Sequence, residues 1–320
     1  MKDLTSILVV LDGSPRDTPL LTKALLLARE LNARIELFSC ETQLEYPRQK
    51  VSAQRGFETA RQNTVADLYD YLRRLSHSVT AHNVAVTIDV VCRSPLHEGI
   101  VHKVFKSCPD LVIKAAGTER SAGHPTLDVD DWQLVRTCPV PLMLSRGGAW
   151  SSRPRFTAAV NVLAEETPDL LERILRSAAY LSDGCRGELD VVFGECASAA
   201  GHSGKAPAAK LRNLARELHL GDDRVWTLAG DPAATLPAFA AKRHSDVLVL
   251  GALTLRTHPT ALAGTLTRKS MDTLDCDFLF LRPGRFEFPV RRENEAAWAN
   301  SCSTSYAARG QVGSETYGRV

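Results

Sequence analysis

A loop in the last third of the chain carries residues suited to binding phosphate. Gly251 is followed after two residues by Thr254, and after nine more residues by the pair Gly264-Thr265. A glycine lets backbone approach a phosphate closely, and the free amides at the start of a helix donate to anions with the help of the helix dipole. The expected phosphate-binding residues are therefore Gly251, Thr254, Gly264, Thr265 and Leu266.

Two further positions are expected near that loop, because they follow a neighbouring strand. Asn161 and Val162 stand at the end of an apolar run that begins at Phe156. In an open parallel sheet, ligands bind beyond the carboxyl ends of the strands, where the strand order reverses. The side-chain oxygen of Asn161 is an acceptor that suits the amino group of an adenine. Asn161 and Val162 are therefore predicted to contact the base of a nucleotide.

The first half of the chain holds a degenerate version of the same site. Asp12, Gly13 and Ser14 follow the first apolar run, and Gly117 follows a later one. The positions that correspond to the glycines of the second half hold other residues, namely Ala115, Thr118, and Thr126 or Leu127. We favour the second half as the ligand site, because phosphate contacts dominate pockets of this kind.

Lys114 is unusual because it stands inside an apolar run. One interpretation places its ammonium in the first crevice as a partner for a phosphate or a carboxylate. The other has it extend to water or pair with Asp110 or Asp131, which is common for a lysine near a strand end. General experience favours the second interpretation.

Dedicated enzyme chemistry receives little support. The sequence contains no G-x-S-x-G and no H-E-x-x-H, and its paired histidines are five residues apart, so we predict no catalytic residue and no metal site. The eight cysteines form no C-x-x-C pair and are interpreted as buried thiols. Slow ATP hydrolysis at the glycine loop stays a less favoured alternative, because no general base or Mg²⁺ carboxylate stands there.

The composition is that of an ordinary globular protein. The 39 basic and 37 acidic residues give a net charge of +2, which provides no electrostatic footprint for nucleic acid or an anionic membrane. The segment at residues 1–6 is short and polar, and no apolar run approaches the ~20 residues that cross a bilayer. We expect a cytoplasmic protein.

The chain repeats itself. Asp12 and Asn161 are 149 positions apart (161 − 12), and the runs 110–113 and 246–249 are 136 apart (246 − 110). Further matches at similar offsets are Thr18-Pro19 with Thr167-Pro168 and Cys138-Pro139 with Cys276-Asp277. Two copies of one domain are therefore expected.

Apolar runs of strand length alternate with stretches of helical period in both copies, which predicts an α/β fold. The expected strands are 6–11, 34–40, 84–92, 110–115, 140–145, 156–162, 188–194, 224–228, 246–251 and 277–282. The expected helices are 15–32, 57–81, 95–107, 128–137, 166–182, 206–219, 231–243 and 265–275. Each copy is thus a five-stranded parallel doubly wound sheet, and the two form tandem Rossmann-like domains.

Domain boundaries follow from breaks in these patterns. The first domain is expected at 1–146, a linker at 147–154 and the second domain at 155–285. Residues 286–320 are polar and lack periodicity, so we expect a mostly disordered tail.

The glycine spacing, the Asp12-Gly13-Ser14 triplet and the tandem layout resemble the universal stress protein family over residues 4–285. That family has the adenine nucleotide alpha hydrolase-like fold, and its phosphate motif has Gly where this chain has Thr254, and Asp where it has Asn161. In its ATP-binding members, an acidic residue at the position of Asp12 contacts adenine. Neither half matches that pattern in full.

The resemblance implies a stress-response protein, such as one that supports survival of DNA damage or oxidative stress, with ATP or AMP as the bound ligand and no required cofactor. It also implies an internal pseudo-dimer through the last strands (140–145 and 277–282), as a monomer or a homodimer. Alternatives left open are a binder of apolar, lipid-like molecules and a ligand-free scaffold, since the loop also holds apolar residues. No direct nucleic acid or membrane partner is expected.

Overall fold

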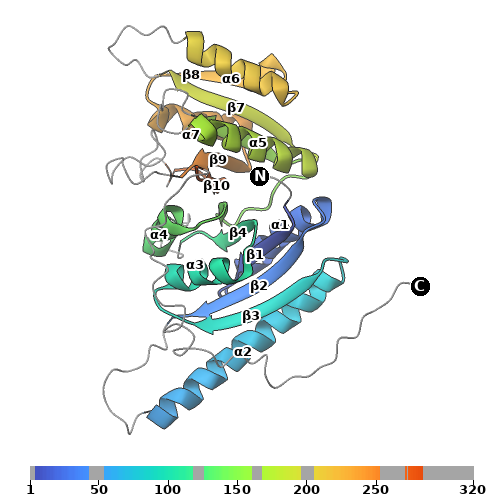
Figure 1. The fold of residues 1–320 in the computed structure, drawn as a ribbon, viewed down its shortest axis with the longest axis vertical. Coiled ribbons are helices and arrows are strands. Elements are labelled where there is room, and N and C mark those ends of the chain that lie inside the picture. The colour runs from blue at the N-terminus through green and yellow to red at the C-terminus, as the bar shows by residue number, and fades with distance from the viewer. Residues whose placement is uncertain are drawn as a thin grey trace, which may run out of the picture. The chain divides into compact units, whose positions relative to one another are not determined.

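The computed structural model describes residues 4–42, 54–117, 126–160, 168–195, 205–252, 271 and 273–283. Ten strands form one sheet in the order β3-β2-β1-β4-β5-β10-β9-β6-β7-β8 (Figure 1). The strands of the first half are β1 Ser6–Val10, β2 Arg34–Glu41, β3 Val86–Cys92, β4 Leu111–Ala115 and β5 Leu142–Ser145. Those of the second half are β6 Arg155–Val160, β7 Glu188–Glu195, β8 Val225–Ala229, β9 Val247–Gly251 and β10 Asp277–Leu281.

Strand pairing confirms the predicted α/β class. Every pair within a half is parallel, and the order of the strands reverses between β1 and β4 and again between β6 and β9. The halves join through β5 and β10, which are antiparallel and place Met143 opposite Leu279. The last strands therefore meet as expected, and one sheet runs through both halves. The expected domain boundaries stay a prediction.

The helices cover both faces of this sheet. They are α1 Asp17–Glu30, α2 Gln54–Thr80, α3 Leu96–Ser107, α4 Val129–Thr137, α5 Pro168–Gly184, α6 Lys205–Glu217 and α7 Pro232–Arg243. A short 3₁₀ turn, Asp222–Arg224, precedes β8. Most of the helix expected at 265–275 and all of the expected disordered tail lie outside the described residues, and residues 273–275, which are described, are not helical.

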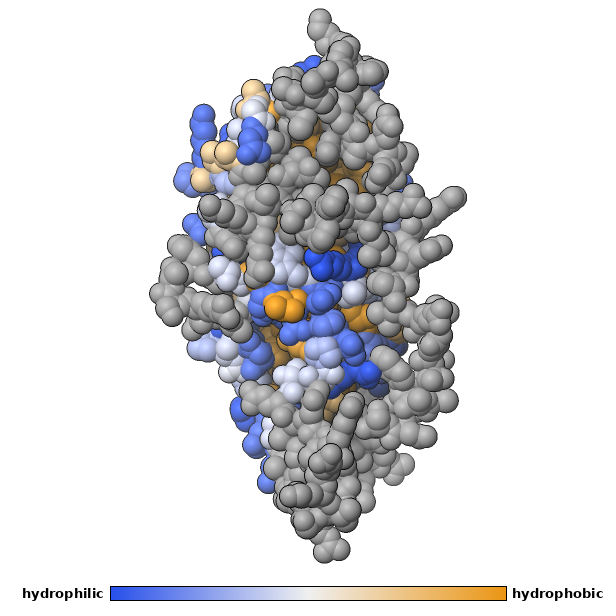
Figure 2. All heavy atoms as spheres, turned by 90° about the vertical axis from the view of Figure 1, so that its left-hand side faces the viewer, coloured by the Kyte–Doolittle hydropathy of each residue, from blue (hydrophilic) through white to orange (hydrophobic). Residues whose placement is uncertain are grey.

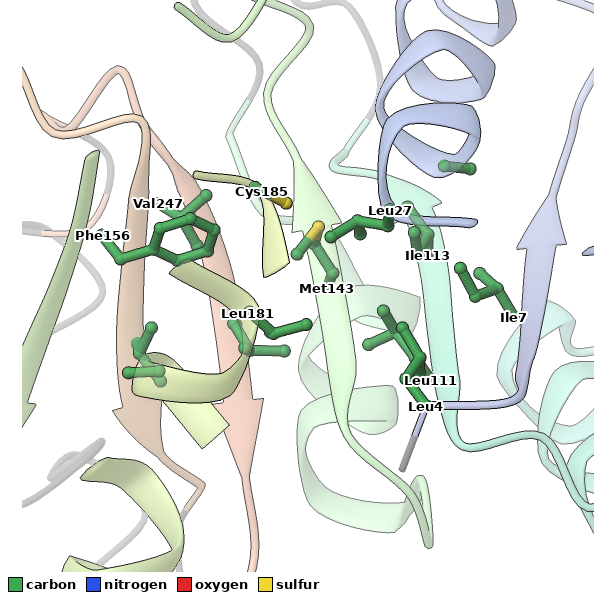
Figure 3. Close-up of a cluster of buried hydrophobic side chains, with 14 of the residues drawn as sticks. Leu4, Ile7, Leu27, Leu111, Ile113, Met143, Phe156, Leu181, Cys185 and Val247 are labelled. Atoms are coloured by element: carbon green, nitrogen blue, oxygen red, sulfur yellow. The ribbon is translucent and has the colours of Figure 1, made fainter. Parts of the chain in front are cut away.

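Alternation along the strands builds two apolar layers, because successive side chains point to opposite faces. Ile7 and Val9 belong to the layer that also holds side chains of α1, α2, α5 and α6, whereas Leu8 and Val10 belong to the layer that holds side chains of α3, α4 and α7. Figure 3 shows the first layer crossing the join, where Leu27 of α1 and Leu181 of α5 lie on either side of Met143. The core is therefore shared by the two halves.

The strand register gives the sequence offset between equivalent residues of the two halves. Ile7 pairs with Leu111 and Phe156 with Val247, so β1 and β6 are 149 apart (156 − 7) and β4 and β9 are 136 apart (247 − 111). Ser6 pairs with Arg34 as Arg155 pairs with Glu188, so β2 and β7 are 154 apart (188 − 34). The offset thus rises by five between the first strand and the second in the later half.

The ends of α1 and α5 locate that insertion. The amide of Ala33 donates to the carbonyl of Ala28, and Gly187 donates to Ser182 in the same way, 154 positions later (187 − 33). The helix bodies are therefore 154 apart, and the five extra residues precede them. The Thr-Pro pairs match at 149 and are wrong as structural equivalents, because the helices are 154 apart. The Cys pairs match at 138 and are also wrong as structural equivalents, because β5 and β10 are 136 apart (278 − 142).

Two arginines cross the join reciprocally. Arg146, after β5, donates from Nη1 to the carbonyl of Met271 at 3.1 Å, and Arg282, after β10, donates from Nη2 to the carbonyl of Val135. Both donors and both acceptors are 136 apart (282 − 146 and 271 − 135). Each half therefore binds the backbone that precedes the last strand of the other half.

A third cross-join contact occurs on one side only. The ammonium of Lys23, on α1, lies 2.6 Å from Oδ2 of Asp277 at the start of β10, and both side chains are buried. Trp150 donates from Nε1 to the same carboxylate at 2.8 Å, and the amide of Arg146 donates to Oδ1 at 2.8 Å. Ser151 binds Asp246 as well, so the expected linker is anchored to the second half.

Candidate functional site

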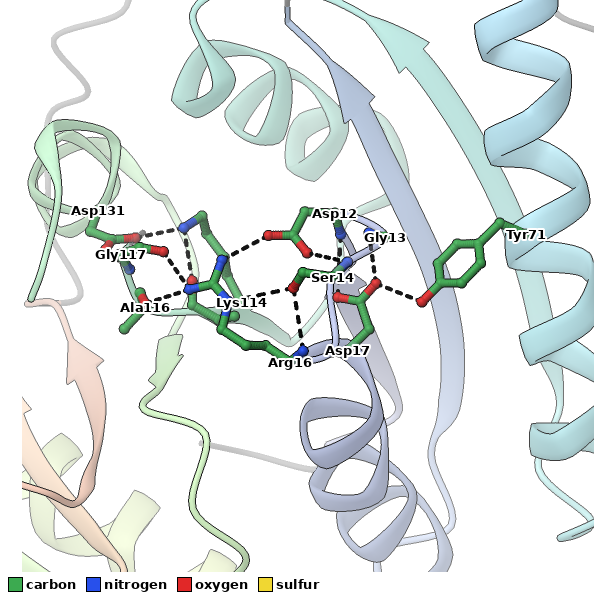
Figure 4. Close-up of polar contacts among 11 residues, drawn as sticks. Asp12, Gly13, Ser14, Arg16, Asp17, Tyr71, Lys114, Ala116, Gly117 and Asp131 are labelled. Atoms are coloured by element: carbon green, nitrogen blue, oxygen red, sulfur yellow. Dashed lines mark hydrogen bonds and ion pairs between the residues drawn. The ribbon is translucent and has the colours of Figure 1, made fainter. Parts of the chain in front are cut away.

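The loop after β1 is shaped by its own polar groups. Gly13 has φ of +80°, a left-handed conformation that favours glycine, and the amide of Ser14 donates to Oδ1 of Asp12 at 3.0 Å. The buried carboxylate of Asp17, in the first turn of α1, accepts from the amides of Asp12 and Gly13. Tyr71 of α2 donates its hydroxyl to Asp17 at 2.9 Å (Figure 4). The hydrogen bonds that Asp17 accepts therefore hold this turn in place.

Arg16 crosses from this loop to the loop after β4. Its Nη2 donates to Oδ2 of Asp12 at 2.8 Å, and its Nη1 donates to the carbonyls of Ala116 at 3.0 Å and Gly117 at 2.5 Å. The Nε lies 3.4 Å from Oγ of Ser14. Figure 4 shows the guanidinium between the two loops. The switch-point crevice of the first half is thus spanned by one of the chain's own side chains.

Lys114 lies deeper and pairs with Asp131 of α4. Its Nζ is 2.8 Å from Oδ1 of Asp131, whose side chain is 0% exposed, and it also donates to the carbonyl of Ala115. The other carboxylate oxygen accepts from the amides of Gly117 at 2.5 Å and Asp128 at 3.1 Å. Pairing with Asp131 is one of the two interpretations given for Lys114 above. Its ammonium is therefore directed at α4.

Burial and charge shift the pKa of three carboxyl groups here. Burial raises the pKa of Asp17 and of Asp131, despite the hydrogen bonds that both accept. Burial also opposes ionisation of Asp12, but hydrogen bonds from Ser14 and the charge of Arg16 outweigh it and lower the pKa of Asp12. The carboxylate that holds Arg16 is thus ionised at neutral pH.

Only a glycine fits at position 117 in this arrangement. Its φ is +60°, and a Cβ at this position would overlap the carbonyl oxygen of Thr126. The close approach of backbone to backbone leaves Gly117 without room to receive a ligand from that side. Gly117, predicted from its place after β4, therefore has a structural explanation in the described residues.

The second-half crevice is described only in part. Asn161, Val162, Thr254, Gly264, Thr265 and Leu266 lie outside the described residues. Gly251 ends β9, and a Cβ on it would lie 2.8 Å from Leu170 Cδ2 and 3.4 Å from Ile174 Cδ1. Ala252 is buried and donates its amide to the carbonyl of Leu281. Apolar side chains of α5 therefore border the predicted phosphate-binding glycine.

The repeat offsets state which residues replace one another. Leu170 corresponds to Arg16 at the helix offset of 154 (188 − 34), and Leu250 corresponds to Lys114 at the strand offset of 136 (247 − 111). Gly251 corresponds to Ala115 at the same strand offset. Two cations of the first half are thus leucines in the second.

Sequence reasoning missed Arg16, Asp17 and Tyr71. Arg16 stands four residues after Asp12, which is the spacing of an ion pair on one helical turn, and that signal was available. Tyr71 is 54 residues from Asp17, and no local pattern connects them.

The described residues include no cluster of three or more His, Cys, Asp or Glu side chains that could hold a metal ion. Within the same ranges, no helix is long and apolar enough to cross a membrane. On the face drawn in Figure 2, apolar colour occurs in small separate areas where residues are described. Single exposed apolar side chains such as Val129 and Phe105 are normal for a protein surface.

Comparison with known proteins bears on the family resemblance. No family model matches the chain. It is 22% identical over 315 residues to universal stress protein E of Photorhabdus laumondii, covering 92% of this chain and 100% of that protein. It is 21% identical over 308 residues to universal stress protein E of Escherichia coli K12, covering 91% of this chain and 98% of that one.

Solved structures agree in fold. A universal stress protein of Archaeoglobus fulgidus superposes with a TM-score of 0.66 at 11% identity, covering 89% of this chain and 100% of that chain. A functionally unknown protein of Pseudomonas aeruginosa superposes with a TM-score of 0.66 at 23% identity, covering 88% and 93%. The predicted resemblance to universal stress proteins is thereby confirmed, and the chain has their fold along most of its length.

Proposed function

We propose that this chain is a stress-response protein of the tandem universal stress type that binds a small ligand in its second half. The ligand is a nucleotide such as ATP or AMP. Gly251, Thr254 and the 264–266 segment hold its phosphates, and Asn161 and Val162 contact its adenine base. The protein binds and does not turn over its ligand, and it works in the cytoplasm. Its assembly is a monomer with an internal pseudo-dimer, or a homodimer of that unit.

One observation carries the choice of half. Arg16, Asp12, Lys114 and Asp131 satisfy one another across the first crevice, so a nucleotide there would have to displace buried or half-buried ion pairs. Breaking such pairs is costly when a charge is left without its partner. Gly251, the member of the second-half pattern that the structure describes, has Leu170 and Ile174 beside it and no ion pair.

A second candidate ligand class is apolar. Leu170 and Ile174 lie against Gly251, and the loop beyond it holds Leu253, Leu255 and Leu262. Pockets lined mainly by apolar groups suit lipid-like molecules. The same residues also suit a scaffold that binds nothing.

Native mass spectrometry of the purified chain tests occupancy, and thermal unfolding with ATP, AMP or a long-chain fatty acid tests the ligand class. A ligand at one hundred times its Kd stabilises the folded state by about 2.7 kcal/mol. We expect ATP or AMP to raise the melting temperature, and Gly264→Trp to remove that increase. Phosphate release by the wild type should stay at background.

The matched control is Gly148→Trp. Gly148 lies in the expected linker, and a Cβ added to it would meet no heavy atom within 4 Å, so a side chain fits there. This variant should respond to nucleotides as the wild type does. A wild type that responds only to the fatty acid would replace the nucleotide proposal with the apolar one, and a response to neither would favour the scaffold.

A further inference from the structure

Among the described residues, the groups that bind the guanidinium of Arg16 all act as hydrogen-bond acceptors. They are one carboxylate oxygen of Asp12, the carbonyl oxygens of Ala116 and Gly117, and the hydroxyl of Ser14. A guanidinium has five N–H donors in a planar fork and no acceptor, so the two sides are complementary. Such a cradle recognises a cation that donates in several directions.

The cradle is held in place by contacts that do not involve Arg16. The amide of Ala116 donates to the carbonyl of Ser145 at 2.7 Å, and the amide of Gly117 donates to Asp131. On the other side, Ser14 donates its amide to Asp12. The acceptors should therefore keep their places when the Arg16 side chain is removed, since their own backbone groups are anchored elsewhere.

Charge in the crevice favours a cation over a phosphate. Lys114 is neutralised by Asp131 at 2.8 Å, and Asp12, among the described residues, is neutralised by Arg16 alone. Without Arg16 the crevice would hold an unpaired carboxylate and two carbonyl oxygens, all of which repel a phosphate. The Asp12 side chain is 49% exposed and that of Arg16 is 17% exposed, so a small ion can enter from solvent.

We propose that the first-half crevice is a binding site for guanidinium-type cations, and that Arg16 is its resident occupant. The side chain fills the site from within and ties the loop after β1 to the loop after β4. The first half is consequently closed to nucleotides, and this holds whether or not the second half binds one.

The test is chemical rescue of Arg16→Ala by methylguanidinium. The variant should melt a few degrees below the wild type, and millimolar methylguanidinium chloride should recover most of that loss. Sodium chloride and urea, which supply ionic strength and a neutral molecule of similar shape, should recover none. The wild type should not respond, because its own arginine occupies the site.

Arg176→Ala is the matched control, since Arg176 forms an exposed pair with Glu172 on α5. Equal responses of the two variants to methylguanidinium would overturn the proposal. So would a larger rise in melting temperature with ATP for Arg16→Ala than for the wild type, because the excess would make the first-half crevice a nucleotide site that Arg16 blocks.

If Arg16→Ala does not fold alone, its refolding yield in methylguanidinium replaces the melting measurement. Folding that depends on the cation supports the cradle, and no folding at any millimolar concentration refutes it. Adding Asp12→Asn to Arg16→Ala should abolish the rescue in either measurement, because the cradle then lacks the carboxylate that attracts a cation.

Discussion

The two crevices occupy corresponding places in the sheet, yet Arg16 stands in one and Leu170 in the other. Lys114 and Leu250 show the same change one strand away. In the first half, ions and backbone carbonyls close the crevice, whereas apolar contacts border the glycine in the second. The two halves share one fold, and the exchange of two cations for two leucines makes one crevice polar and the other apolar.

The join of the halves shows a second asymmetry. Lys23 and Asp277 form a buried ion pair on one side. The register places Ser177 and Pro141 at the corresponding positions on the other side, at the offsets of 154 (188 − 34) and 136 (278 − 142). The reciprocal arginines are duplicated, whereas this ion pair is not. Variants that remove or exchange such groups test how much each asymmetry contributes.

Asp277→Ala should have the largest effect. The substitution leaves the buried ammonium of Lys23 without a counterion and removes the acceptor of Trp150 Nε1. Removing one partner of a buried ion pair destabilises a protein by about 3–5 kcal/mol, which urea unfolding would measure. Asp223→Ala, at a side chain that is 83% exposed, should change the free energy of unfolding by less than about 0.5 kcal/mol. Equal losses in the two variants would contradict the importance of the buried pair.

Lys114→Leu gives the first half the residue of the second. It leaves the carboxylate of Asp131 buried without its cation, and we expect a loss of about 3 kcal/mol at neutral pH. Burial already raises the pKa of Asp131, so the loss should shrink as the pH falls and the carboxyl becomes protonated. Unfolding at several pH values checks this, with Lys106→Leu on the exposed side of α3 as the control. A loss that does not vary with pH would argue against Asp131 as the partner.

Arg16→Leu makes the corresponding exchange at the crevice. It removes hydrogen bonds to Asp12, Ala116 and Gly117 from a partly exposed position, so a loss of about 1–2 kcal/mol is expected. Equilibrium unfolding beside Arg176→Leu separates this effect from the loss of a surface charge. If both variants lose the same amount, Arg16 does not tie the two loops together.

Asp12→Asn should have the smallest effect, and one that depends on pH. Hydrogen bonds from Ser14 and the charge of Arg16 together outweigh burial and lower the pKa of Asp12 from its ordinary 3.8. A carboxyl with a lowered pKa in the folded state stabilises the protein above its ordinary pKa, and this contribution is lost as the pH falls through the folded value. Wild type and variant should therefore differ at neutral pH and converge below pH 3.8. In an Arg16→Ala background part of that difference should disappear, and the part that comes from the hydrogen bonds of Ser14 should stay.

Hydrophobic patterning predicted the strands well. All ten lie within two residues of their expected ends, because buried parallel strands are short, nearly continuous apolar runs. The pairing of Lys114 with Asp131 was one of two alternatives. Lys23 with Asp277, and Arg146 with Met271, were not foreseen, since these partners are 254 and 125 residues apart and no local pattern connects them. The five-residue insertion before α5 was also hidden, because two Thr-Pro pairs happened to match across it.

The anchored linker changes how this join responds to dilution. Two separate copies that met through their last strands would dissociate as their concentration fell, and symmetry would require each contact to occur twice. Here Trp150 and Ser151 fasten the connecting segment, so the second half meets the first at an effective concentration set by the chain itself. A contact formed once, such as Lys23 with Asp277, cannot occur in a symmetric dimer of identical copies. Tethering therefore frees each half to diverge without losing its partner.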